Sequence, residues 1–123
     1  MKNFKKKILI IDPDERDRES LLSFLQHKEY QVETGKGLTD AIKKITSNHY
    51  HCVIMAVELP EMKGYEAVSI IKNIDSDTKV IMTTKKNTKE LEAKVREKDI
   101  FYYFIKSFGK EELKLAIKNA FSK

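Results

Sequence analysis

The stretch from His51 to Gly64 is where the sequence predicts that chemistry would be placed. An unbroken apolar run stops there at a polar loop bounded by Pro60 and Gly64. Short apolar runs flanked by turn residues are typical of buried strands in a parallel sheet, and ligands of such sheets bind just past the carboxyl ends of the strands. The tip of this strand is Ala56, which offers only a methyl group, and a carboxylate, Glu58, follows two residues later.

The first predicted strand, residues 8–11, ends in acidic residues instead of a phosphate-binding loop. Asp12, Pro13 and Asp14 follow it directly. A flavodoxin-like enzyme that binds a phosphate-bearing cofactor would need a hydroxyl- and glycine-rich turn at this point, and the carboxylates here would repel a phosphate. The sequence therefore favours a domain that is not an enzyme.

The elements that position these residues alternate between strand and helix. Strands are predicted at residues 8–11, 30–33, the run up to 56, 80–82 and 101–105. Apolar residues at helical spacing predict a helix after each strand; the first has Asp12 as its N-cap and ends at about Lys28, and the charged segment 89–98 is the least regular. Such alternation predicts an α/β fold, with a parallel sheet covered by helices on both faces.

Composition describes one globular domain spanning residues 1–123, with 41% hydrophobic and 35% charged residues. No apolar stretch is long enough to span a bilayer, and the N-terminus lacks a signal-peptide core. The single cysteine, Cys52, can form no intrachain disulfide, which fits a reducing cytoplasm. The net charge of +5 permits contact with nucleic acid, but the lysines are scattered over all predicted helices instead of forming one stripe.

Four segments, each at the end of a predicted strand and in the same order, resemble the motifs of response regulator receiver domains. They are residues 7–12, 58–64, 80–84 and 103–108. The similarity runs from about residue 6 to residue 121. The resemblance implies a flavodoxin-like (βα)5 three-layer sandwich with strand order 2-1-3-4-5, and a role in the signal transduction or phosphorelay of a two-component system.

Receivers take a phosphoryl group from a histidine kinase onto an aspartate, with Mg²⁺ held by carboxylates and a lysine and a hydroxyl meeting the transferred charge. The resemblance carries the lysine onto Lys106, the hydroxyl onto Thr84 and one acidic residue onto Asp12. Pro13 falls where the family has its second metal-binding carboxylate. Ala56 falls where the aspartate nucleophile should be, so the resemblance implies that the acceptor is missing.

Two further departures point the same way. Lys85 stands where the family usually has a small residue, and a long cation there would crowd the entrance to the site. Ser107 replaces a proline whose preceding bond is usually cis, and we expect a trans bond because a non-proline cis bond costs roughly 3 kcal/mol. The sequence thus predicts a degenerate pseudo-receiver with no catalytic residue, and Mg²⁺ binding that is weak or absent. Its vestigial pocket comprises Asp12, Asp14, Ala56, Glu58, Thr84, Lys85 and Lys106.

Structural roles are left open for several of these residues. Lys106 can pair with Asp12 or Glu58, and Thr84 can cap the segment that follows it. His49 and His51, two apart in a turn at the opposite end of the sheet, are expected to be solvated rather than to bind a metal.

For function, the first hypothesis is a phosphorylation-independent protein-interaction module. Its docking face would combine the fourth helix, fifth strand and last helix, with Tyr103 and Tyr102 as contact residues, although plain packing is an equal alternative for them. Partners would be proteins: a histidine kinase-linked pathway, an effector domain, or a second copy through the last helix and fifth strand. The alternatives are residual phosphotransfer or metal binding through Asp12 and Glu58, or a basic domain associated with nucleic acid.

Overall fold

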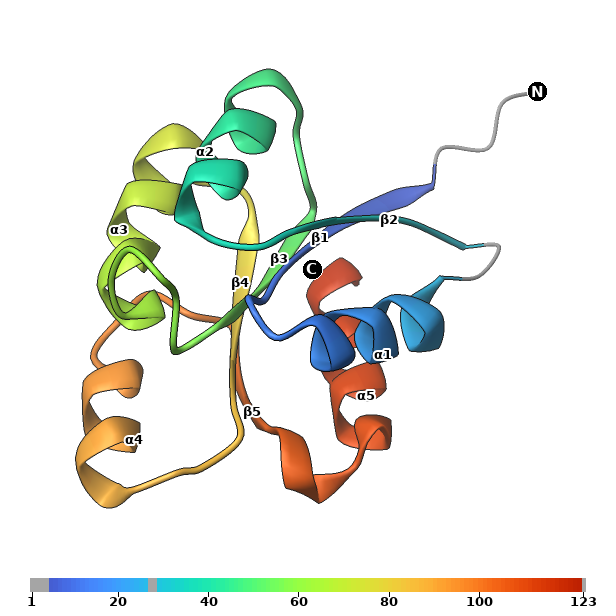
Figure 1. Cartoon of the computed structure of the whole chain (residues 1–123). Coiled ribbons are helices and arrows are strands. Elements are labelled where there is room, and N and C mark those ends of the chain that lie inside the picture. The colour runs from blue at the N-terminus through green and yellow to red at the C-terminus, as the bar shows by residue number, and fades with distance from the viewer. Residues whose placement is uncertain (1–4, 27–28, 123) are drawn as a thin grey trace.

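The computed structural model describes residues 5–26 and 29–122. In them, strands and helices alternate along the chain (Figure 1). The elements are β1 (Lys6–Ile11), α1 (Glu15–Leu25), β2 (Tyr30–Gly35), α2 (Leu38–Ser47), β3 (Cys52–Ala56), α3 (Gly64–Ile74), β4 (Lys79–Thr84), α4 (Lys89–Arg96), β5 (Tyr102–Ile105), a 3-10 turn (Lys106–Phe108) and α5 (Lys110–Phe121). All strand pairs are parallel, and the order β2-β1-β3-β4-β5 confirms the predicted flavodoxin-like sheet.

Helices cover both faces of the sheet because its central strands carry apolar side chains on both sides. On one face the strands pack against α1 and α5, where Leu25 and Ile117 are buried. On the other they pack against α2, α3 and α4, where Ile45, Ile71 and Val95 are buried. Figure 1 shows this division, with α1 and α5 together on one side. Each fully buried aliphatic side chain contributes about 1.5–3 kcal/mol, so these two clusters hold the three layers together.

The register of the sheet brings the carboxyl ends of four strands to one edge. Ala56, the last residue of β3, pairs with Thr83 of β4. Asp12 and Lys106 directly follow β1 and β5. Residues that are far apart in the sequence therefore meet at this edge, as the alternation of strands and helices predicts.

Helix α1 begins later than the sequence predicts. Its N-cap is Asp14 instead of Asp12, and the Asp14 carboxylate accepts a hydrogen bond of 3.0 Å from the backbone N–H of Asp17. The backbone N–H of Asp12 still donates to the carbonyl of Gly35, so this residue continues the sheet ladder. Pro13 also disfavours helical backbone at the residue before it.

Helix α4 forms inside the predicted charged segment, and its cap differs from the prediction. Thr88 is the N-cap, and its hydroxyl oxygen accepts from the backbone N–H of Leu91 at 3.0 Å. The prediction that Thr84 caps this segment is wrong, because its hydroxyl donates to the carbonyl of Lys86 at 2.9 Å instead. The Thr84 side chain therefore closes the turn after β4.

Helix α1 ends at Leu25, whereas the sequence predicts an end near Lys28, which lies outside the described residues. None of the described helices combines the length and hydropathy that crossing a bilayer requires.

Candidate functional site

The carboxyl ends of β1, β3, β4 and β5 surround a cavity of about 410 Å³. Apolar side chains of Pro13, Ala56, Val57 and Leu91 line part of it, and acidic, lysine and threonine side chains line the rest. These polar residues are Asp12, Asp14, Asp17, Glu58, Thr83, Thr84, Lys85, Lys86 and Lys106. The cavity thus brings together every residue of the predicted vestigial pocket.

Lys106 extends from the turn after β5 and bridges the end of β1 to α1. Its Nζ lies 2.7 Å from Oδ2 of Asp12 and 2.7 Å from Oδ2 of Asp17. The Lys106 side chain is 17% exposed and that of Asp12 only 3%. Charge-assisted hydrogen bonds of this length belong to the strong class, and burial limits their screening by water. Of the two partners predicted for Lys106, the structure has Asp12.

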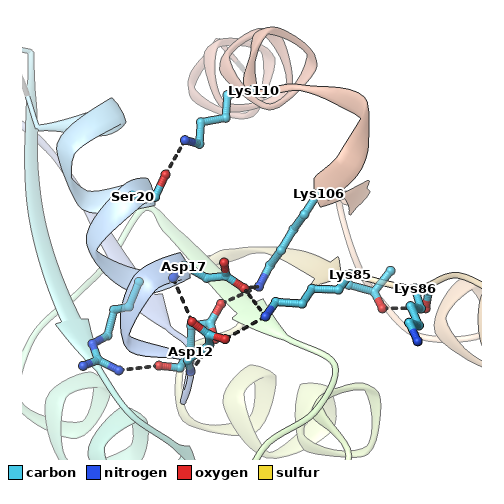
Figure 2. A network of polar contacts seen from close by, with 10 residues as sticks. Asp12, Asp17, Ser20, Lys85, Lys86, Lys106 and Lys110 are labelled. Carbon is cyan, nitrogen blue, oxygen red and sulfur yellow. Dashed lines mark hydrogen bonds and ion pairs between the residues drawn. The ribbon is translucent and has the colours of Figure 1, made fainter.

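Lys85 reaches the same carboxylates from the end of β4. Its Nζ lies 2.7 Å from Oδ2 of Asp14 and 3.3 Å from Oδ2 of Asp17. Figure 2 shows both lysine side chains pointing toward the start of α1. The hydrogen bond from Lys85, aided by the backbone N–H of Asp17, lowers the pKa of Asp14 to about 2, and the same contact raises the pKa of Lys85. We call these residues the acid–lysine network: Asp12, Asp14, Asp17, Lys85 and Lys106.

Further contacts fix the start of α1 and the segment that leads into it. The guanidinium of Arg18 donates to the backbone carbonyl of Asp12 at 2.8 Å, and the Asp12 carboxylate accepts from the backbone N–H of Asp14 at 2.9 Å. Lys110 of α5 donates to the hydroxyl of Ser20 (Figure 2). Helix α1 is therefore tied to the ends of β1 and β5 and to α5.

Glu58 lines the cavity but takes no part in the network. Its carboxylate lies 2.7 and 2.8 Å from Nζ of Lys63, and its side chain is 72% exposed. The backbones of these two residues form an antiparallel bridge, which directs both side chains along the surface of the loop. The predicted alternative in which Glu58 pairs with Lys106 is therefore wrong.

The remaining predicted residues offer little to an incoming group. Ala56 presents its methyl group at the tip of β3 and is 6% exposed. The hydroxyl of Thr84 is occupied by the carbonyl of Lys86. The bond between Lys106 and Ser107 is trans, as predicted.

The two predicted contact tyrosines differ in exposure. Tyr103 is only 5% exposed, its hydroxyl donates to Oδ1 of Asn87 at 2.6 Å, and burial raises its pKa. Arg96 of α4 lies over its ring at 5.8 Å. Tyr102 is half-buried, and its hydroxyl donates to the carboxylate of Glu112 in α5 at 3.2 Å. In this conformation Tyr103 ties β5 to the loop before α4 rather than pointing outward.

A family model described as "Response regulator receiver domain" matches residues 8–118. This chain belongs to the response regulator receiver family. The receiver fold is also seen in its structural neighbours. The signal receiver domain of an HD domain-containing protein from Pseudomonas fluorescens Pf-5 has a TM-score of 0.89 at 26% identity, covering 98% of this chain and 89% of that one.

Two other relatives differ in how much of their own length the match covers. The response regulator TrrA from Thermotoga maritima, solved in complex with Mg²⁺-BeF, has a TM-score of 0.83 at 30% identity over 94% of this chain and 98% of that one. The transcriptional regulatory protein SrrA of Staphylococcus aureus (strain NCTC 8325 / PS 47) is 26% identical over 111 residues, which is 90% of this chain. The chain spans 46% of the length of SrrA.

The carboxylates of this receiver do not form a set that fits Mg²⁺. The ion requires near-octahedral oxygen ligands, yet Asp12 and Asp17 share one lysine ammonium and Asp14 is held by another. Over the described ranges, no group of three or more His, Cys, Asp and Glu side chains has the arrangement of a metal site. At the far end of the sheet, His49 pairs with Asp75, and Nδ1 of His51 accepts from a backbone N–H.

Sequence reasoning missed two residues of this receiver. Asp17 pairs with both lysines of the network. Its spacing could have indicated this, because it lies four residues before the buried Leu21 on the same face of α1. Asn87 accepts the hydroxyl of Tyr103, and no sequence pattern pointed to that contact.

Proposed function

We propose that this chain is a receiver domain that works without phosphorylation at residue 56, as a protein-interaction module of a two-component pathway in the cytoplasm, and that it is not an enzyme. The observation that carries the proposal is the acid–lysine network. Lys106, which the family uses to meet a phosphoryl group, is already held by two carboxylates at 2.7 Å.

The charged residues that line the cavity support this proposal. A phosphoryl group arriving at the tip of β3 would find the methyl group of Ala56, which cannot form an acyl phosphate. It would also approach three carboxylates whose lysine partners are already engaged. Freeing Lys106 would leave Asp12, which is almost fully buried, without its cation, and an unpaired buried charge is costly. The network is thus a stable alternative to the phosphorylated arrangement.

The same network leads to the proposed docking face. Lys85 belongs to the loop between β4 and α4, and Asn87 in that loop accepts the hydroxyl of Tyr103. One end of the loop is thereby held by α1 and the other by β5. We propose that this fixes one conformation of the face formed by α4, β5 and α5, where an effector domain, a kinase-linked protein or a second copy would bind. Tyr102 would contact such a partner directly, and Tyr103 would act by holding the loop.

Phosphorylation is tested by incubating the chain with acetyl phosphate and Mg²⁺ and measuring intact mass. We expect no gain of a phosphoryl group, and TrrA of Thermotoga maritima, a response regulator solved in complex with Mg²⁺-BeF, is treated in parallel for comparison. A variant with Pro13→Asp and Ala56→Asp tests whether the fold still supports the reaction once both carboxylates are supplied. A phosphoryl adduct on the unmodified chain would refute the proposal, and mapping it to Asp12 or Glu58 would establish residual phosphotransfer instead.

A further inference from the structure

The outward face of α5 carries an exposed leucine between two charged residues. Leu115 is 61% exposed. Glu111 and Lys118 are exposed as well, and their spacing from Leu115 places all three on one side of the helix. The other side of α5 supplies the residues that it buries in the core, which are Leu113, Ala116, Ile117 and Ala120. The outward face is therefore available for contact with another molecule.

A second exposed apolar side chain lies close to this face in sequence. Phe108 is 65% exposed and belongs to the turn directly before α5. Of the three large apolar side chains that are exposed in residues 5–26 and 29–122, two are thus in α5 or in the turn that leads into it. Within the same ranges, neither Glu111 nor Lys118 has an ion-pair partner. Both the apolar surface and the charges around it are left without a contact in the domain.

The order of these charges makes α5 complementary to a second copy that runs in the opposite direction. Glu111 lies in the first turn and Lys118 in the last, an order that also suits the helix dipole. Leu115 stands four residues after Glu111 and three residues before Lys118. In an antiparallel pair with Leu115 on the two-fold axis, Glu111 of each copy would meet Lys118 of the partner subunit. The same patch would then serve both copies, as a two-fold interface requires.

We infer that the partner of this domain is a second copy, bound through antiparallel pairing of two α5 helices, with Leu115 at the centre and Glu111 paired with Lys118 of the partner subunit on either side. The inference rests on the proposed function, because α5 belongs to the proposed docking face and a second copy is one of the partners named there. The pairing needs neither α4 nor β5. Tyr102 would therefore stay available for an effector domain or a kinase-linked protein.

The length of the helix determines how strong the pairing can be. Helix α5 has 12 residues, and at a rise of about 1.5 Å per residue it is about 18 Å long. Contact along one such helix buries less than the roughly 800 Å² per partner of a standard stable interface. We therefore expect a reversible dimer with a Kd of about 0.01–1 mM. The net charge of +5 on each copy opposes pairing, but at about 0.15 M salt the screening length of about 8 Å limits this repulsion.

Sedimentation velocity of the full chain, at protein concentrations from about 0.01 to 1 mM, measures the self-association. We expect the sedimentation coefficient to rise with concentration. Leu115→Asp should remove the rise, because it places two like charges on the two-fold axis. Ile74→Asp is the matched control and should leave the rise unchanged, because Ile74 is also exposed but lies at the end of α3. No rise in the unmodified chain, or a rise that Leu115→Asp leaves intact, overturns the inference.

Charge reversal tests the two ion pairs and the antiparallel order. Glu111→Lys and Lys118→Glu should each weaken self-association at least about tenfold, because both ion pairs become repulsive contacts. An equimolar mixture of the two variants should associate as tightly as the unmodified chain, since each reversed position then faces an opposite charge. Lys94→Glu, an exposed change in α4, should have no effect. If the mixture associates no better than either variant alone, or if Lys94→Glu abolishes association, the inference is wrong.

Failure of this inference can be distinguished from failure of the proposed function. A phosphoryl adduct formed with acetyl phosphate, measured as intact mass, would contradict the proposed function whatever the sedimentation shows. Absence of self-association, with no adduct on the unmodified chain, would overturn only the dimer and leave an effector domain or a kinase-linked protein as the partner.

Discussion

Replacing Lys106 with methionine removes the cation that two carboxylates share while keeping much of the side-chain volume. In the folded protein, Asp12 and Asp17 would then face each other across the cavity without their common partner. Removing one member of a buried ion pair typically costs about 3–5 kcal/mol, because the other charge is left unpaired. Asp17 is 24% exposed and Lys106 17%, so water recovers part of that cost. We expect a loss of about 2–3 kcal/mol.

Urea unfolding followed by circular dichroism at pH 7 measures this loss. With an m-value of about 1.5 kcal/mol per M, the midpoint should fall by about 1–2 M. Lys63→Met is the matched control, because the ion pair of Lys63 with Glu58 lies on the surface and such pairs contribute about 0–1 kcal/mol. Adding Asp12→Asn to Lys106→Met should recover part of the stability, since a neutral amide needs no cation. A midpoint change for Lys106→Met no larger than that of the control would refute this account of the network.

Three other predictions concern the surroundings of the cavity. The pKa of Asp14 is about 2 in the folded protein against 3.8 for the free group, so the folded state binds fewer protons in this range and stability falls as the pH falls from about 4 to 2. Lys85→Met should reduce this loss of stability, measured as the difference in thermal unfolding temperature between pH 5 and pH 3. An unchanged difference would contradict the prediction. Glu61→Ala should cost about 1 kcal/mol in urea unfolding, because its carboxylate caps the first turn of α2, and an effect below about 0.3 kcal/mol would count against that role. Tyr103→Phe should shift the NMR signal of Asn87 and weaken capture of partner proteins from the source cells, whereas unchanged capture would argue that the loop does not control the docking face.

The elements and their order follow from the sequence because each strand is a short apolar run that ends at turn or charged residues. The central run up to Ala56 is apolar throughout, which is typical of a strand buried on both faces, and every residue of β3 is indeed buried. The start of α1 could not be predicted as well. Asp12 and Asp14 are both good caps by type, and the choice between them depends on the sheet partner Gly35, which is distant in sequence.

Which side chains pair at the site depends on where each one points, and the pattern of strands and helices predicts this only in part. Lys106 was expected near Asp12 because the resemblance to receivers places both in one pocket at the carboxyl ends of the parallel strands. Glu58 was expected there too, but the bridge between its backbone and that of Lys63 turns it away. Asp17 could have been found from its position on the buried face of α1, whereas Asn87 depends on a loop conformation that the sequence does not encode by spacing.

On the proposed function, the network gives Lys106 a role that does not require an acceptor carboxylate. A lysine opposite Ala56 with a single carboxylate partner would be easy to replace by an uncharged residue together with Asp12. Asp17 changes this balance, because it is held by Lys106 and by Lys85 at once. Replacing either lysine would then leave Asp17 with only one cation beside it. Replacing Lys85 would also release its end of the β4–α4 loop from α1, while Tyr103 holds the other end of that loop through Asn87. The lysine would persist as the cation that keeps α1, β4 and β5 in one arrangement, independent of any transferred phosphate.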